Sequence, residues 1–411
     1  MLSRKWISTG ETEAERRIEE VLRTGATALD LSSLELVRLP GTIAQLTELT
    51  KLNVSSNKLA ALPEEIGQLV SLTELDLCDN ELTSLPDTLI QLSQLTKLNI
   101  SQNLLMPLPE WIGQLTRLSD LDVSGNELTY LPSSIGDLVH LTVLSVNYNE
   151  LTCLPDTIGQ LTDLTQIYAY ANRLTHLPPS LGQLHRLSGL HLGQNQLSGL
   201  PDSLSQLTSL SSLGIYDNEL TTLPDCVLQM TSLEELQVGL NHLTDIPSWI
   251  GQLTHLKELG LHSNELTSLP DTMSHFAHLT ELHLAHNHLT QLPDWIGQFT
   301  GLTELRVSHN RLTGLPASLS QLRNLKRLEI AKCGLKHLPD WIGKCLDLAV
   351  LNISQNQLTD LPAWIGQLAK LRRLDVSGNQ ITRLPEEMGQ LTNLTKLVVS
   401  DNPLIVPLPP G

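Results

Sequence analysis

The chain has 411 residues, which exceeds the usual size of one compact core, so several domains or an array of repeats is expected. It carries 26 lysines and arginines against 44 aspartates and glutamates, a net charge of −18, with a sequence pI of about 5.1. This balance excludes general binding to nucleic acids or anionic membranes, which requires a basic surface. No run of 18 apolar residues is present, so the sequence predicts no membrane-spanning helix.

The first segment, residues 1–25, predicts a short helix that caps the rest of the chain. Residues 12–23 carry a helical pattern that opens with the capping-box spacing of Thr12 and Glu15 and stops at Gly25. The apolar residues of this stretch share one helical face: Ala14, Ile18, Val21 and Leu22. The segment lacks the apolar core of a secretion signal.

Residues 26–411 repeat with a period of 23 residues and without a single insertion. Asparagine keeps one phase of this period from Asn57 to Asn402. Cys333 takes its place once, and Leu34 holds the phase before the first asparagine, which makes 17 units. The pattern L-x-x-L-x-L-x-x-N-x-L-x-x-L-P-x-x-I-G-x-L is that of a leucine-rich repeat.

Each unit has parts with separate structural roles. The L-x-L alternation predicts a short strand, and the asparagine turns the chain while its amide bonds backbone groups. No unit buries its leucines alone, so neighbouring units must stack. We therefore expect an α/β-type repeat solenoid, a leucine-rich-repeat horseshoe. It should have a concave parallel sheet of about 17 short strands, an irregular or 3-10 convex side and an N-terminal capping helix. Cysteine fills the asparagine position only weakly, so the coil around Cys333 should be the loosest internal one.

The end of the sequence, "NPLIVPLPPG", contains no cap, although terminal repeats normally need one. We therefore expect the natural protein to continue beyond Gly411. The cysteines occupy five different phases of the repeat and form no terminal cluster of the kind found in secreted repeat domains: Cys78, Cys153, Cys226, Cys333 and Cys345. A cytoplasmic chain is expected.

The stretch "AERRIEEVLRTGATALDLSSLELVRLP" followed by "LPEEIGQLVSLTELDLCDNELTSLP" resembles the N-terminal leucine-rich repeats of bacterial Roco proteins. The resemblance covers essentially the whole chain. In that family a Ras-like GTPase domain (Roc) and a dimerising COR domain come after the repeats. The resemblance implies a regulatory, protein-binding domain of a GTP-binding protein, whose partner is another protein or the parent's own Roc and COR domains. It also implies homodimerisation, mainly through COR.

The chain itself contains no G-x-x-x-x-G-K-S/T phosphate-binding loop and no assembly of nucleophile, base and oxyanion donors. We therefore expect it to be non-catalytic and to need no cofactor. Two alternatives remain open. One is a stand-alone adaptor or bacterial effector without a GTPase, and the other is the substrate-recognition half of a ubiquitin ligase. The sequence beyond Gly411 would separate them.

Aromatic side chains gather on the strands in the middle of the array: Tyr148, Tyr168, Tyr170, His191 and Tyr216. Glycines such as Gly189, Gly239 and Gly260 interleave with them, so we expect hollows flanked by amphipathic rings. Such rings favour protein interfaces. The alternative is that these rings only fill the concave surface.

At the first strand position the early repeats alternate in charge, through Lys51, Glu74, Lys97 and Asp120, which predicts a self-neutralising face. Four later repeats carry only glutamate there: Glu235, Glu258, Glu281 and Glu304. Like charges on neighbouring strands destabilise a sheet, so either nearby cations such as Arg306, Arg327 and His283 or a basic partner segment should relieve them.

A metal site is the weakest interpretation of this region. Nine of the 14 histidines fall between His242 and His309, but they scatter over strand, turn and convex phases, and only His262 and His283 lie on the concave strands there. We therefore expect no bound metal. The predicted partner-binding surface combines the aromatic residues and the four glutamates with His262, His283 and Arg306.

Overall fold

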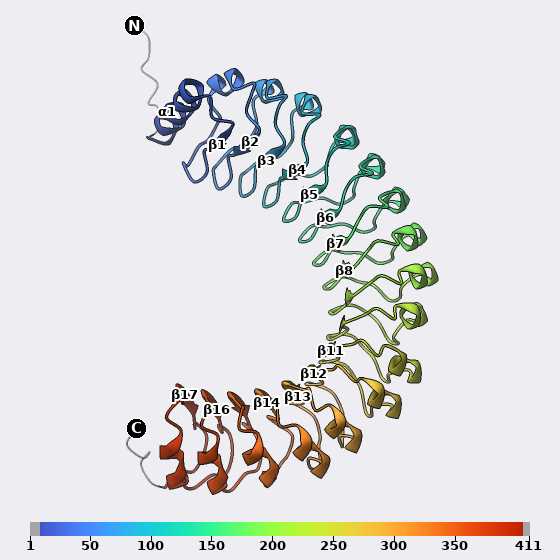
Figure 1. The fold of residues 1–411 in the computed structure, drawn as a ribbon, viewed down its shortest axis with the longest axis vertical. Coiled ribbons are helices and arrows are strands. Elements are labelled where there is room, and N and C mark those ends of the chain that lie inside the picture. Colours follow the sequence, from blue (N-terminus) through green and yellow to red (C-terminus); the bar gives the residue numbers. More distant parts are fainter. Residues whose placement is uncertain (1–8, 406–411) are drawn as a thin grey trace. The chain divides into compact units, whose positions relative to one another are not determined.

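The structure, a computed structural model, describes residues 9–405 and falls into two compact units, Met1–Leu210 and Ser211–Gly411. Both units are built in the same way. Each repeat places a three-residue strand on one side and a five-residue 3-10 helix on the other (Figure 1). The described residues contain 17 strands and 16 such helices, so the predicted number of short strands is confirmed.

The first unit begins with the α-helix α1 (Thr9–Thr24). Its strands are β1 (Ala28–Asp30), β2 (Lys51–Asn53), β3 (Glu74–Asp76), β4 (Lys97–Asn99), β5 (Asp120–Asp122), β6 (Val143–Ser145), β7 (Gln166–Tyr168) and β8 (Gly189–His191). Its 3-10 helices are η1 (Gly41–Gln45), η2 (Glu64–Gln68), η3 (Asp87–Gln91), η4 (Glu110–Gln114), η5 (Ser133–Asp137), η6 (Asp156–Gln160), η7 (Pro179–Gln183) and η8 (Asp202–Gln206).

The second unit has the strands β9 (Ser212–Gly214), β10 (Glu235–Gln237), β11 (Glu258–Gly260), β12 (Glu281–His283), β13 (Glu304–Arg306), β14 (Arg327–Glu329), β15 (Val350–Asn352), β16 (Arg373–Asp375) and β17 (Lys396–Val398). Its 3-10 helices are η9 (Asp225–Gln229), η10 (Ser248–Gln252), η11 (Asp271–His275), η12 (Asp294–Gln298), η13 (Ala317–Gln321), η14 (Asp340–Lys344), η15 (Ala363–Gln367) and η16 (Glu386–Gln390).

Within each unit every strand pairs in parallel with the next, and equivalent residues of consecutive repeats lie directly opposite each other. Lys51 pairs with Glu74 in the first unit, and Glu258 pairs with Glu281 in the second. The period of 23 residues therefore becomes a spatial register, in which each repeat position forms a column across the strands. This register lets columns of side chains be read directly from the sequence.

The returning side of each repeat is shaped by its proline and its apolar residues. Pro63 has the extended backbone angles φ −71° and ψ 148°, which end the preceding segment before η2. The helix closes when the Leu69 amide donates to the Ile66 carbonyl oxygen over 3.2 Å. Ile66, Leu69 and Leu72 are fully buried against neighbouring repeats. Burial stabilises each such side chain by roughly 1.5–3 kcal/mol.

Close contact between neighbouring coils requires glycine at the "IGQ" position. At Gly297 an added Cβ would lie 2.3 Å from the carbonyl oxygen of Ser318, which belongs to the next coil. Such an approach is far inside van der Waals contact. A side chain at this position would therefore push the two coils apart.

Asparagine connects each coil to the coil before it. The Asn287 side-chain amide donates to the carbonyl oxygens of Leu261 and Leu284 at 2.9 and 3.1 Å, and its Oδ1 accepts from the Leu266 amide at 3.0 Å. Leu261 and Leu266 belong to the preceding repeat. The predicted role of the asparagine in bonding backbone groups is confirmed.

Cys333 replaces only part of this set of bonds. Its thiol donates to the carbonyl oxygens of Val307 and Ala331 at 3.3 and 3.4 Å. Sulfur does not substitute for the Oδ1 acceptor, and within the described chain the Leu312 amide, at the same phase as the Leu266 amide, makes no hydrogen bond. Burial raises the pKa of the Cys333 thiol to about 11, so it stays protonated.

The capping helix differs from its prediction at its start. Because α1 begins at Thr9, Thr12 lies inside the helix, and the predicted capping box with Glu15 is wrong. The Glu15 carboxylate instead accepts a hydrogen bond from the Thr42 hydroxyl at 2.7 Å, which fastens the helix to η1. The predicted stop is confirmed, since Gly25 has φ +70° and donates to the Val21 carbonyl oxygen.

The buried face of α1 is also shifted toward its start. Ala14 and Ile18 are fully buried as predicted, whereas Leu22 is 43% exposed, so its assignment to the buried face is wrong. Glu11 is buried in its place and forms an ion pair with Arg38 at 3.0 Å. Within residues 9–405 no helix combines the length and the apolar character needed to cross a membrane.

Replacing Cys333 by asparagine should stabilise the second unit. The new Oδ1 can accept the Leu312 amide, and one added hydrogen bond contributes about 1 kcal/mol. Urea denaturation should therefore show a higher midpoint with an unchanged slope. Cys153→Ser, at a half-buried cysteine outside this column, is the matched control and should change the midpoint little. A lower midpoint for Cys333→Asn would mean that the cysteine coil is already optimally bonded.

Candidate functional site: the strand face of each unit

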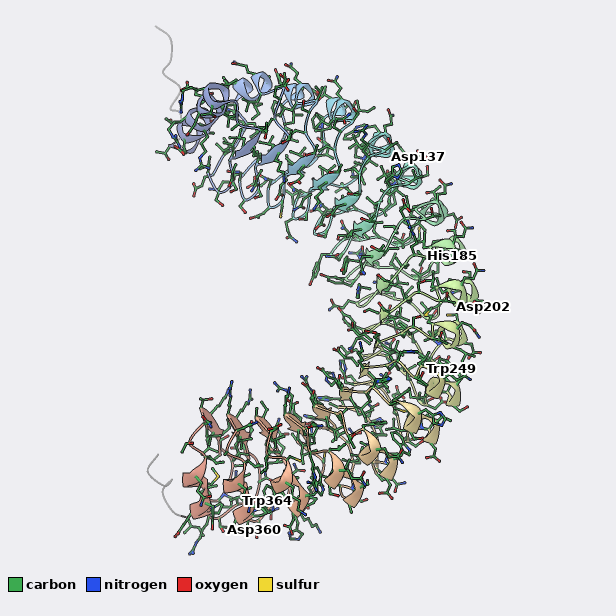
Figure 2. The ribbon with its side chains drawn as sticks, in the orientation of Figure 1. Asp137, His185, Asp202, Trp249, Asp360 and Trp364 are labelled. Carbon is green, nitrogen blue, oxygen red and sulfur yellow. The ribbon has the colours of Figure 1, made fainter. Side chains whose placement is uncertain are left out.

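Side chains that point away from the leucine core form an exposed surface on each unit, here called the strand face. In β7, for example, Ile167 is buried while Gln166 and Tyr168 on either side of it are half-buried, and Tyr170 comes next on the same face. Figure 2 shows Trp249 and Trp364 of the second unit on the opposite side, among the 3-10 helices. The strand face is where side chains vary most between repeats.

The first unit brings four of the predicted aromatic residues together, and they are here called the aromatic cluster: Tyr148, Tyr168, Tyr170 and His191. The Tyr168 and His191 rings stack with centroids 4.9 Å apart and an interplanar angle of 5°. The Tyr148 and Tyr170 rings meet edge to face at 5.2 Å and 82°. Burial, and then Tyr148, raise the pKa of Tyr170.

Tyr148 is the most exposed member of the cluster, with 54% of its surface accessible. Its backbone is left-handed, with φ +53°, as at the equivalent Ser56, Asp79 and Gly125 of other repeats. A bulky aromatic residue is costly in this conformation, where glycine or a small polar residue fits best. Tyr148 is therefore an exposed ring held at a position that does not favour it.

The predicted hollows are wrong at Gly189 and Gly239, because side chains of neighbouring repeats fill the space beside these glycines. A Cβ added to Gly189 would lie 2.0 Å from Oε1 of Gln166, and one added to Gly239 would lie 2.3 Å from the His262 ring. These long side chains reach across from the adjacent strand and lie over the glycine. Tyr216, predicted to share the aromatic surface, lies just after β9 in the second unit and is half-buried there.

The second unit carries four glutamates directly opposite one another on β10 to β13, here called the glutamate column: Glu235, Glu258, Glu281 and Glu304. Glu304 is neutralised by the Arg306 guanidinium and by Arg327 at 3.5 Å, and the His283 imidazole lies 3.3 Å from it. The predicted relief by Arg306 and Arg327 is thus confirmed at one end of the column.

In the middle of the glutamate column, no such cation offsets the repulsion between the carboxylates of the described residues. Glu235 accepts a hydrogen bond from the Ser212 hydroxyl at 2.8 Å, but among the described residues Glu258 has no cation within 4 Å. Burial raises the pKa of Glu258, and the neighbouring Glu281 and Glu235 raise it further. Burial followed by Glu304 likewise raises the pKa of Glu281, although Arg306 opposes this. Glu258 is therefore a carboxylate with like charges on both sides.

The two histidines beside the column are poor sources of positive charge. Burial lowers the pKa of His262 and of His283, and the Arg306 cation lowers both further, although Glu304 opposes this at His283. Both imidazoles are consequently neutral at neutral pH. Protonating either imidazole, which would add positive charge near the glutamates, therefore requires a more acidic solution than protonating an ordinary histidine would.

A potential metal cluster lies at the Arg306 end of the column. One ligand atom from each of Glu281, His283 and Glu304 falls within 4.8 Å of the others. The scatter of histidines along the sequence concealed this group, because two of its three ligands are carboxylates. Glu304 already accepts hydrogen bonds from Arg306 and lies 3.5 Å from Arg327, so a metal ion would have to displace two guanidinium groups. The expectation of no bound metal stays a prediction.

A hollow of about 550 Å³ over the first strands was missed by the sequence analysis. Its walls include the alternating column of Lys51, Glu74, Lys97 and Asp120, and Lys51 pairs with Glu74 at 2.9 Å. Its floor includes asparagines and aspartates whose Oδ1 atoms accept backbone amides two residues onward, as Asn53 does from Ser55 at 2.9 Å. The predicted neutralisation is confirmed for Lys51 and Glu74, and much of the polar lining is already bonded.

Replacing Glu258 by glutamine should stabilise the protein at neutral pH and not in acid. The folded state keeps a proton on Glu258 above its ordinary pKa of 4.5, where the unfolded chain has lost it. The free energy of unfolding therefore falls as the pH rises through that window. Removing the charge should raise it at pH 7 by a few tenths to about 1 kcal/mol, and the gain should vanish near about pH 4.

Urea denaturation at both pH values measures this difference between Glu258→Gln and the unmodified chain. The exposed Glu127 of the first unit provides the control, since Glu127→Gln should change stability little at either pH. A Glu258→Gln variant less stable than the unmodified chain at pH 7 would show that the carboxylate has a favourable partner.

The chain matches known leucine-rich repeats along most of its length. The family profile "Leucine-rich repeat region" matches residues 28–126 and 238–346, and the profile "Leucine rich repeat" matches residues 323–381 and 347–404. A search of curated proteins finds no match.

Solved structures agree with this assignment. A leucine-rich-repeat protein of Leptospira interrogans is 34% identical, with a TM-score of 0.76, over 92% of this chain and 97% of its own. An internalin of Listeria monocytogenes is 25% identical, with a TM-score of 0.67, over 76% of this chain and 93% of its own. The Arabidopsis receptor kinase HAESA, solved with a peptide hormone and a co-receptor, is 26% identical, with a TM-score of 0.68, over 92% and 75%. The chain belongs to the leucine-rich-repeat family.

Proposed function

We propose that the chain is a non-catalytic protein-interaction and regulatory domain that binds a protein partner through its strand faces. Leucine-rich repeats are in general non-catalytic interaction modules. The observation that carries the proposal is the aromatic cluster, and above all Tyr148. An exposed ring at a left-handed backbone position adds nothing to the leucine core, whereas exposed tyrosines contribute strongly to protein interfaces.

A second proposed contact surface lies in the second unit. It comprises Tyr216, the glutamate column and the side chains beside that column: His262, His283 and Arg306. Glu258 has like charges on both sides and no cation within 4 Å among the described residues. A lysine or arginine of a basic partner segment would supply the missing charge. HAESA, solved with a peptide hormone, is a precedent for peptide binding by this fold.

The more specific proposal is that the chain regulates a Roco-type GTPase. It rests on the resemblance of residues 14–40 and of the repeats after them. Residues 1–25 would then cap a single array, residues 26–411, and the partner would be another protein or the parent's own Roc and COR domains. The parent would be cytoplasmic and would dimerise through COR.

A stand-alone repeat protein, either an adaptor or a bacterial effector, is the second candidate. It is favoured by the Leptospira interrogans protein, because this chain matches 97% of that protein's chain. The repeat array therefore spans nearly all of that solved chain. In this case the strand faces would bind a separate protein, with no attached GTPase to regulate.

Sequencing the native transcript beyond the codon for Gly411 distinguishes the two candidates. A Roco parent requires a G-x-x-x-x-G-K-S/T loop in the next domain, because its backbone amides hold the nucleotide phosphates. We expect this loop to be present. A stop codon directly after Gly411 would exclude the Roco proposal and leave the stand-alone protein.

A photo-crosslinking amino acid tests the aromatic cluster in cells of the source organism. Benzoylphenylalanine in place of Tyr148 should give a defined covalent adduct. The same residue in place of His185, among the 3-10 helices of the first unit, is the matched control and should give none (Figure 2). Changing Tyr168 and Tyr170 to serine should lower the adduct yield at least roughly fivefold, since aromatic residues dominate interface energetics.

The melting temperature of the Tyr168→Ser, Tyr170→Ser variant decides how a lost adduct is interpreted. A nearly unchanged value would assign the loss to the contact. A large decrease would mean that the rings stabilise the fold instead. Equal adducts from positions 148 and 185 would contradict binding through the aromatic cluster.

A further inference from the structure

The second unit changes the sign of its charge at β14. Residues 211–322 contain three lysines and arginines against 12 aspartates and glutamates, a net charge of −9. Residues 323–411 contain 11 against eight, a net charge of +3. The last part of the chain is therefore basic, although the chain as a whole has a charge of −18.

The positive charges of this part gather at the edge of the sheet where β14 to β17 begin, and they are here called the basic patch: Lys326, Lys370, Arg372, Arg373 and Lys396. Arg373 lies directly opposite Lys396 on the neighbouring strand. A hollow of about 300 Å³ is lined by Lys326, Lys370 and Arg372, and also by Asp347, Ala349 and Asn393.

Only one member of the patch has a carboxylate of the described chain within ion-pair distance. Lys370 pairs with Asp347 at 2.5 Å. Within residues 9–405 the other four form no ion pair of 4 Å or less, and all four side chains are exposed. In the early repeats of the first unit the charges of neighbouring strands alternate instead, and Lys51 pairs with Glu74 at 2.9 Å. The fold therefore does not demand a row of like charges.

The positive charges of the basic patch repel one another, and a bound anion would offset this repulsion. Like charges directly opposite on neighbouring strands are destabilising, as for Arg373 and Lys396. A bound carboxylate would reverse this interaction, and the hollow beside Ala349 leaves room for its side chain. The patch thus has the charge, the exposure and the space for an anionic ligand.

The adjoining glutamate column limits the size of that ligand. Four parallel strands about 4.8 Å apart span only about 15 Å. Directly before them, Glu304 and Glu281 occupy the same column on β13 and β12. A duplex nucleic acid or a membrane surface would extend over these carboxylates and be repelled. A short acidic peptide would contact only the basic patch.

We propose that the basic patch binds a short acidic segment of a protein partner, laid across the starts of β14 to β17. This site shares no residue with the aromatic cluster or with the glutamate column. It can therefore be tested without the partner discussed above.

The test uses a fluorescein-labelled hexaglutamate peptide and the full chain, with fluorescence anisotropy as the measurement. The unmodified chain should bind the peptide, and raising NaCl from about 50 to about 200 mM should weaken binding, because salt screens exposed charges. Arg372→Glu with Arg373→Glu should weaken it at least about tenfold. The matched control, Arg23→Glu with Arg117→Glu, makes the same charge change at exposed arginines of the first unit and should alter affinity less than about twofold.

A milder variant distinguishes loss of binding from loss of folding. Lys326→Gln with Lys396→Gln removes two charges without introducing new ones, and it should also weaken binding while the melting temperature is retained. No binding by the unmodified chain, or equal weakening by the control variant, would overturn the proposal. So would tighter binding of a single-stranded oligothymidine of equal charge or of phosphatidylserine vesicles.

Discussion

The hydrogen bonds of the buried asparagines are the interaction on which the rest of each unit depends. Asn287 joins its own turn to the carbonyl oxygen of Leu261 and the amide of Leu266, both in the preceding coil. Leucine burial supplies most of the stabilisation, but it is not directional. The asparagine supplies the direction, because its donors and acceptor are satisfied only when consecutive coils are in one register. The same register then fixes which strand-face side chains become neighbours.

This fixed register separates the structural positions from the variable ones. The leucines, prolines and asparagines recur because each coil needs them, and Gly297 recurs because the next coil leaves no room for a Cβ. The strand face carries no such requirement. It therefore accommodates alternating charge near Lys51, stacked rings near Tyr168 and a row of like charges near Glu258 on the same backbone. The aromatic cluster and the glutamate column depart locally from what would be most stable, and binding is proposed at both.

The sequence was sufficient for the strands, the asparagine bonds and the opposition of the glutamates, because an uninterrupted period turns sequence position into spatial position. It failed where the outcome depends on side-chain conformation. Nothing in the sequence indicates that Gln166 covers Gly189, or that Arg306 turns toward Glu304 rather than toward Glu258. It also failed at the start of α1, where the tertiary hydrogen bond between Glu15 and Thr42 replaces the local capping box. The hollow over the first strands arises from side-chain placement and has no sequence signal.

The turn after each strand keeps a left-handed backbone whichever residue occupies it, so its side chain can change by mutation without a change of backbone. Fifteen described residues other than glycine occupy this position with φ values between +51° and +58°, so the backbone there does not adapt to the side chain it carries. A mutation at such a position alters what is displayed and leaves the path of the chain unchanged. Tyr148, Leu240 and His309 all occupy this conformation in different repeats. Variation among descendants of such a gene can therefore exchange one displayed residue at a time, and new specificity need not wait for a new fold.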